Sequence, residues 1–331
     1  MKKTKKQING QSSLQETSII RPLFQKTFTF PTFDRSDHFS GDSVAQNASL
    51  TYHFLMRIAT STNLVSFRPD GSKTEMQHLI PLYAQGGFSL LDLNLCEMMN
   101  PQSVFRTDRY MERVGLLSAL RERWGVAYIQ SHAPYVRDRF HMDEEQGKLE
   151  DQLVRRAVHI SAILGIRQIV IHPACSDDHL VEKNVVYLSP FVEQAAKEGI
   201  NVALENLDGK NEIQEADQLM ELVSHFGDNT GVCLDFGHAH MHGLDLPNEI
   251  RTYGARLIAT HVADNHGSMD EHLLPFYGTV DWKACMQALR ETGYRGDLTF
   301  ECMKQNQYLP DGLRSMAIRQ AKEIGDFLLS L

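Results

Sequence analysis

Several features of other protein classes are missing from this sequence of 331 residues. It has no uninterrupted apolar run of about 18 residues, which a membrane-spanning helix requires. Its basic start, MKKTKK, is not followed by an apolar segment, so we expect no secretory signal there. We therefore expect a cytoplasmic protein that does not cross a membrane.

The sequence is also poor in cysteine and in net positive charge. Its five cysteines are an odd number without a CxxC pair, which argues against a disulfide framework and suits a reducing compartment. The net charge of −9 gives no overall basic footprint for nucleic acid, which is therefore the less favoured partner. A glycine-rich dinucleotide fingerprint is missing after the first predicted strand, where ATSTNLVSF stands instead.

Apolar segments of strand length alternate with segments of helix length through most of the chain. We predict strands at 54–59, 89–95, 126–131, 168–171, 201–204, 231–234, 256–260 and 297–300. We predict helices at 74–87, 107–125, 144–165, 190–199, 214–227, 246–254, 281–293 and 315–331. Eight such units predict an α/β fold, a (β/α)8 TIM barrel over residues 53–331. We expect the preceding residues 1–52 to be an irregular, partly disordered N-terminal extension.

Six of the predicted strands run directly into a residue that can bind a metal ion. These residues are His132, His172, Glu205, Asp235, His261 and Glu301. Their spacings of 26 to 40 residues match the length of one βα unit. Because the C-terminal ends of barrel strands converge on one cavity, the pattern predicts a metal-dependent active site there.

Three further ligand-type residues lie close to these strand ends. His238 follows Asp235 in the sequence LDFGHAH, and Asp270 and His272 lie two residues apart in the long segment after His261. Residues two apart in an extended segment point to the same side, so Asp270 and His272 can bind one ion together. Imidazole combined with carboxylate suits Mn²⁺, Zn²⁺, Co²⁺ or Fe²⁺ better than Ca²⁺.

Together these residues resemble the xylose isomerase-like TIM barrel superfamily, which includes sugar phosphate isomerases and epimerases and the endonuclease IV-type barrels. The resemblance covers roughly residues 53 to 328. For the isomerase and epimerase branch it implies a single divalent metal held by Glu205, Asp235, His261 and Glu301. It also implies that Glu205 and Glu301 are catalytic and move a proton through a metal-stabilised enediolate of a sugar or sugar phosphate.

In that branch the remaining ligand-type residues would bind the substrate: His132, His172, His238, Asp270 and His272. The endonuclease branch implies that all nine residues bind metal, as in a multinuclear zinc phosphodiesterase or abasic-site endonuclease. Lyase or dehydratase chemistry on a keto-sugar is a further alternative on the same barrel. A homo-oligomer is left open by the sequence.

One segment departs from the sugar isomerase pattern. Barrels of this kind carry Gly-Glu-Gly before a T-x-D-W motif, where this chain has Phe276, Tyr277 and Gly278. Ketose 3-epimerases carry an arginine at the position of Gly267. The tight turn in this segment is therefore expected to be altered.

Overall fold

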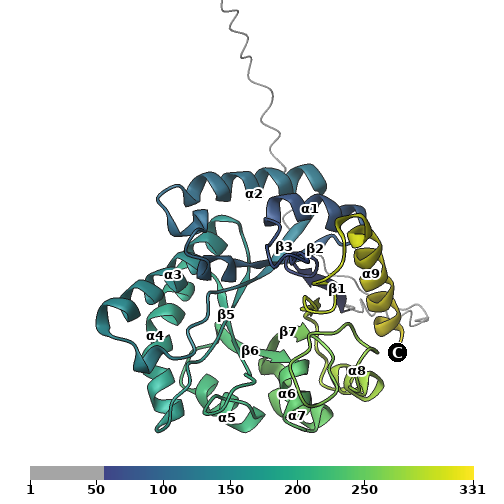
Figure 1. The fold of residues 1–331 in the computed structure, drawn as a ribbon. Coiled ribbons are helices and arrows are strands. Elements are labelled where there is room, and N and C mark those ends of the chain that lie inside the picture. The colour runs from purple at the N-terminus through teal and green to yellow at the C-terminus, as the bar shows by residue number, and fades with distance from the viewer. Residues whose placement is uncertain (1–55) are drawn as a thin grey trace, which may run out of the picture. The chain divides into compact units, whose positions relative to one another are not determined.

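The computed structural model describes residues 56–331, which form a closed barrel of parallel strands (Figure 1). Each strand pairs in parallel with the next, and β8 pairs with β1. The strands are β1 (Arg57–Ser61), β2 (Leu90–Asn94), β3 (Ala127–His132), β4 (Gln168–Ile171), β5 (Asn201–Glu205), β6 (Thr230–Asp235), β7 (Leu257–Val262) and β8 (Asp297–Phe300). The predicted (β/α)8 barrel is confirmed. The predicted extension at 1–52 lies outside the described residues.

The helices form a layer outside the strands (Figure 1). They are α1 (Met76–Gln85), α2 (Tyr110–Trp124), α3 (Glu144–Ile163), α4 (Leu180–Glu198), α5 (Ala216–Ser224), α6 (Phe236–Met241), α7 (Leu246–Tyr253), α8 (Trp282–Glu291) and α9 (Arg314–Ser330). Short 3₁₀ turns are η1 (Leu95–Met99), η2 (Val104–Arg106), η3 (Arg139–His141), η4 (Gly254–Arg256) and η5 (Asp311–Leu313). Among residues 56–331, none of the helices has the length and apolar character needed to span a bilayer.

Two helices differ from the sequence prediction. Helix α4 begins ten residues before Pro190, which we expected to start it. A proline inside a helix leaves the carbonyl four residues earlier without its usual donor, and the residue at that position, Val186, is 75% exposed, so the missing bond falls on the solvent side of the helix. Helix α6 follows β6 at once, because the Asp235 side chain accepts a hydrogen bond from the backbone N–H of His238 at 2.8 Å and caps it.

The apolar core has two parts. The larger part lies between the strands and the helices, and a small part fills the barrel interior with Val170, Ala203, Cys233 and Ala259. Each of these four residues stands two positions before a ligand-type residue on or directly after the same strand. Since side chains two apart on a strand point to the same face, the interior layer forms the floor beneath those ligand-type residues.

Candidate metal centre and active site

The nine candidate residues lie at the C-terminal ends of the strands and in the segments that follow them. Six come from strand ends, as predicted: His132 (β3), His172 (after β4), Glu205 (β5), Asp235 (β6), His261 (β7) and Glu301 (after β8). His238 lies in α6, and Asp270 and His272 lie in the β7–α8 loop. Seven of the nine are buried, and the side chains of His172 and Asp270 are only 10% and 13% exposed. Since all nine are ionisable, they must compensate one another or bind a cation.

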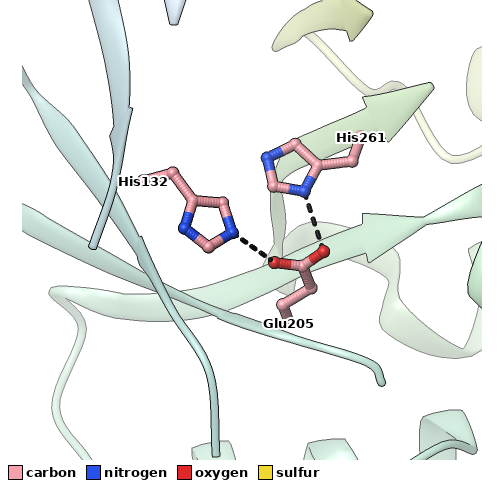
Figure 2. A group of neighbouring side chains, drawn as sticks. All are labelled: His132, Glu205 and His261. Atoms are coloured by element: carbon pink, nitrogen blue, oxygen red, sulfur yellow. Dashed lines mark hydrogen bonds and ion pairs between the residues drawn. The ribbon is translucent and has the colours of Figure 1, made fainter. Parts of the chain in front are cut away.

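Glu205 is the centre of the arrangement (Figure 2). Its Oε1 lies 2.8 Å from His261 Nδ1, and its Oε2 lies 3.2 Å from His132 Nε2. The same Oε2 lies 2.9 Å from His172 Nε2. One carboxylate therefore contacts three imidazoles from three other strands, which only a closed barrel brings together.

A first group of ligand-type atoms comes from four consecutive strands. Glu205, Asp235, His261 and Glu301 each offer one atom, and these four atoms lie within 4.8 Å of one another. We call these residues the strand-end cluster. His261 Nδ1 lies 3.2 Å from Glu301 Oε2, and all four side chains are buried.

A second group is built mainly from segments outside the strands. One atom each from His238, Asp270 and His272 also lies within 4.8 Å of the others, and we call these residues the loop cluster. His272 Nε2 lies 2.6 Å from Asp270 Oδ2. The expectation of an extended segment here was wrong, because His272 has a φ of 45°, in the left-handed region. The pair meets through this local turn of the backbone.

Three of the histidines have Nδ1 hydrogen-bonded to a backbone carbonyl, which orients the ring. His238 Nδ1 lies 2.9 Å from the Asn206 carbonyl oxygen, and His272 Nδ1 lies 2.8 Å from the Glu301 carbonyl oxygen. His132 Nδ1 lies 2.8 Å from the Ala133 carbonyl oxygen. In each case the ring donates to the carbonyl through Nδ1, so Nε2 is left as the nitrogen that can bind a metal or a substrate.

The electrostatics of the strand-end cluster favour a bound cation. Burial raises the pKa of Asp235 to about 6, against the opposing effect of His238. Burial would also raise the pKa of Glu205, but the imidazoles of His261 and His172 outweigh it and hold that pKa well below its usual range. Asp235 Oδ2 is buried without a hydrogen-bond partner. An anionic cluster with an unpartnered buried oxygen is what a divalent ion would stabilise.

Sequence reasoning missed two residues beneath the site. Asp92 on β2 is fully buried, and its Oδ2 lies 3.8 Å from His261 Nε2. Gln130 Nε2 lies 3.1 Å from the same nitrogen. Both therefore contact the side of the His261 ring that faces away from Glu205. A signal was present, since a charged residue stands in the middle of the apolar run SLLDLNL.

The loop cluster depends on a third missed residue, Asp264. Its fully buried carboxylate accepts four hydrogen bonds across the β7–α8 segment. The donors are the backbone N–H groups of Asn265 (2.9 Å), Phe276 (2.9 Å) and Val280 (3.1 Å) and the indole Nε1 of Trp282 (2.9 Å). This network fixes both ends of the loop that carries Asp270 and His272.

In the loop where an altered turn was expected, Phe276 stands in place of the first glycine of the expected Gly-Glu-Gly. Phe276 has a φ of 73°, a region that glycine adopts at little cost and bulky residues rarely adopt. Its ring packs against Phe327 with a centroid distance of 5.5 Å. At Gly278 a Cβ atom would lie 2.3 Å from the Asn265 carbonyl oxygen, so this position requires glycine.

Comparison with protein families identifies the fold. The family model of the xylose isomerase-like TIM barrel matches residues 89–319. The chain belongs to the xylose isomerase-like TIM barrel family. The predicted resemblance is thereby confirmed.

Relatives of known sequence match parts of the chain. An uncharacterised protein, y4fM, of Sinorhizobium fredii is 32% identical over 160 residues. The match covers 45% of this chain and 51% of that relative. Inosose isomerase of Bacillus subtilis is 22% identical, over 44% of this chain and 57% of the enzyme. A probable endonuclease 4 of Acholeplasma laidlawii is 24% identical, over 59% of this chain and 74% of that protein.

Solved structures share the fold along most of the chain. A D-tagatose 3-epimerase-like protein superposes with a TM-score of 0.65 at 23% identity, covering 83% of this chain and 97% of its own. D-psicose 3-epimerase, solved in the presence of D-fructose, superposes with a TM-score of 0.66 at 17% identity, covering 83% and 100%. At these identities the likeness establishes the barrel fold.

Proposed function

We propose that this protein is a divalent-metal-dependent isomerase or epimerase acting on a small sugar or sugar phosphate. The observation that carries the proposal is the strand-end cluster, in which Glu205 Oε1 and Glu301 Oε2 lie 2.8 and 3.2 Å from the same atom, His261 Nδ1. Two carboxylates close to one position suit removal of a proton from carbon and its return. The epimerase structures and the inosose isomerase relative support this choice.

The strand-end residues fit a divalent ion, since they provide three carboxylates and one imidazole with a buried, unpartnered oxygen on Asp235. When bound by Glu205, Asp235, His261 and Glu301, such an ion would polarise a substrate carbonyl and its neighbouring hydroxyl. The candidates are Mn²⁺, Zn²⁺, Co²⁺ and Fe²⁺.

The protein's own groups would do the remaining work. Either Glu205 or Glu301 removes the proton from the carbon beside the carbonyl, and a carboxyl group returns a proton to the substrate. The oxygen of each glutamate that is not engaged with metal must hold that proton. The interior layer beneath the cluster limits access of water from below.

The other five residues are proposed to bind the substrate. His238 and His272 each have Nδ1 engaged by a backbone carbonyl, which leaves Nε2 for a substrate oxygen. His132 and His172 both contact Glu205 Oε2, and their Nε2 atoms lie 3.1 Å apart. Asp270 accepts from Lys304 Nζ at 2.9 Å, which places an ammonium group beside the loop cluster.

A second candidate is a multinuclear zinc phosphodiesterase that acts on abasic-site DNA. It is favoured by the loop cluster and by a third ligand-type group, His132, Glu205 and His261, whose atoms also lie within 4.8 Å of one another. The similarity to the probable endonuclease 4 also supports this candidate. All nine residues would then bind metal.

Two measurements on one preparation separate these candidates. Protein purified without added metal or chelator is analysed for metal content, then incubated in D2O with a panel of ketoses, ketose phosphates and inososes. About one ion per chain with deuterium incorporation beside a carbonyl, followed by NMR, supports the isomerase or epimerase. About three zinc ions with nicking of abasic-site DNA, and no exchange into any sugar, would replace it with the phosphodiesterase.

A further inference from the structure

A group of ligand-type side chains lies at the rim of the barrel, separate from the nine residues already described. It consists of Asp138 and His141 in the β3–α3 loop and Cys175 and Asp177 in the β4–α4 loop, and we call it the rim cluster. One atom each from Asp138, His141 and Cys175 lies within 4.8 Å of the others. Cys175 Sγ lies 3.4 Å from Asp138 Oδ1, and Asp177 Oδ2 lies 3.7 Å from His141 Nε2.

The backbone holds the rim cluster in place. Asp138 directly precedes the 3₁₀ turn η3, which ends at His141, and residues three apart on a 3₁₀ turn share one face. The backbone N–H of Cys175 donates to the Arg137 carbonyl oxygen at 2.9 Å and joins the two loops. Asn211 from the β5–α5 loop donates through its side chain to Asp177 at 2.6 Å. The four side chains are therefore brought together by bonds outside the cluster.

The carboxylates of the rim cluster have no lysine or arginine partner among the described residues. The basic side chains nearby bind other carboxylates: Arg137 binds Asp208 and Glu212, Arg139 binds Asp151, and Lys183 binds Asp178. Over residues 56–331 no ion pair joins a lysine or arginine to Asp138 or Asp177. Asp138 thus lies beside the thiol and Asp177 beside the imidazole, while Arg137 and Arg139 of the β3–α3 loop and Lys183 of α4 pair with other carboxylates.

We propose that the rim cluster is a binding site for a zinc-like divalent ion, distinct from the barrel centre. Sulfur, nitrogen and carboxylate oxygen are the atoms that bind Zn²⁺ in proteins. Asp138, His141 and Cys175 supply one of each, which leaves the fourth position of a tetrahedral site to water or to the nearby Asp177. Binding releases the proton of the Cys175 thiol to solvent as the Sγ–metal bond forms. The ion would link the loop after His132 to the loop that follows His172, and so stiffen one wall of the barrel mouth.

Cobalt substitution tests the proposal without any assay of activity. The full chain is stripped with chelator, kept under a thiol-free reductant and titrated with Co²⁺. A thiolate ligand gives a strong sulfur-to-cobalt absorption band in the near ultraviolet, and none of the nine barrel residues is a cysteine. We expect this band in the wild-type protein. We expect Cys175→Ser to lose it together with one equivalent of bound cobalt.

Two further variants make the result specific. His141→Asn should lower the affinity for cobalt, so that the band forms only at about tenfold or more higher cobalt concentration. Cys96→Ser is the matched control, because Cys96 Sγ lies 3.1 Å from His132 Nδ1 and is a thiol beside the barrel centre. It should keep the full band. Absence of the band from wild-type protein, its persistence in Cys175→Ser, or its loss in Cys96→Ser would overturn the proposal.

Discussion

The strand-end cluster and the loop cluster lie side by side but are held by different means. Glu205, Asp235, His261 and Glu301 stand on or next to hydrogen-bonded strands above a packed interior layer. Asp270 and His272 depend on a loop that is fixed by the carboxylate of Asp264. Under the proposed function, the barrel would provide a rigid metal centre, and the loops would provide the part that distinguishes substrates or recruits further ions.

The largest expected effect is loss of the proposed proton carrier in the strand-end cluster. Glu205→Gln keeps the shape of the side chain but cannot take up a proton, so turnover should fall about 10³-fold, or about 4 kcal/mol in the barrier. The measurement is deuterium exchange into the reacting sugar. Circular dichroism should show an intact fold.

Glu249→Gln is the matched control for this variant. Glu249 is also a buried glutamate, but it lies on α7 and accepts from the Ala216 N–H at 2.7 Å. Its turnover should stay at the wild-type level. Substantial deuterium exchange catalysed by the Glu205→Gln variant would show that Glu205 does not carry the proton.

The next effect concerns the support of the loop cluster. An asparagine at position 264 has one acceptor oxygen, so Asp264→Asn leaves some of the four donors unpaired, at a cost of about 2–3 kcal/mol of unfolding free energy. Denaturant unfolding measures it. Asp281→Asn in the same segment, where the side chain caps α8, should cost less than about 1 kcal/mol. Equal costs for the two variants would show that Asp264 does not hold the loop.

A smaller effect is expected from a ligand within the loop cluster. His272→Asn removes the imidazole that faces Asp270 but leaves the strand-end cluster intact, so turnover should fall about tenfold, or about 1.4 kcal/mol. Metal analysis should still find the strand-end ion. His266→Asn, at an exposed histidine of the same loop that pairs with Glu271, is the control. A loss as large as that of Glu205→Gln would mean that the two clusters act as one centre.

The smallest effect tests the strained turn. Phe276→Ala loses the contact with Phe327 and keeps a side chain in the left-handed region, whereas Phe276→Gly loses the same contact and relieves the strain. The glycine variant should therefore be about 1 kcal/mol more stable than the alanine variant. Thermal unfolding of both proteins measures the difference. Equal stability would show that the turn stores no strain.

Much of the fold could be predicted because each βα unit carries its own signal. Uniformly apolar strands such as that ending at His172 are typical of parallel sheets buried on both faces. The start of α4 and the whole of α6 were not predicted. In α4, Pro190 is compatible with the helix interior because Val186, whose carbonyl loses its donor, is exposed. In α6, the N-cap is Asp235, a residue assigned from the sequence to metal binding.

Six residues of the candidate site could be found because strand ends converge in any parallel barrel. Asp92 and Asp264 were not found, since their importance lies in contacts with His261 and with a loop, which are distant in sequence. The rim cluster was also missed, because its four side chains belong to two loops whose approach depends on backbone bonds between them.

The sequence by itself determined the alternation of strands and helices, and therefore the barrel and the end at which ligand-type side chains gather. Hydrophobic periodicity is local, so it can be read without coordinates. Only the tertiary structure decided which atoms face one another: which oxygen of Glu205 contacts which imidazole, how the left-handed His272 reaches Asp270, and which carboxylates lack a cation. These depend on register, side-chain direction and loop packing, which are set by contacts between residues far apart in the chain.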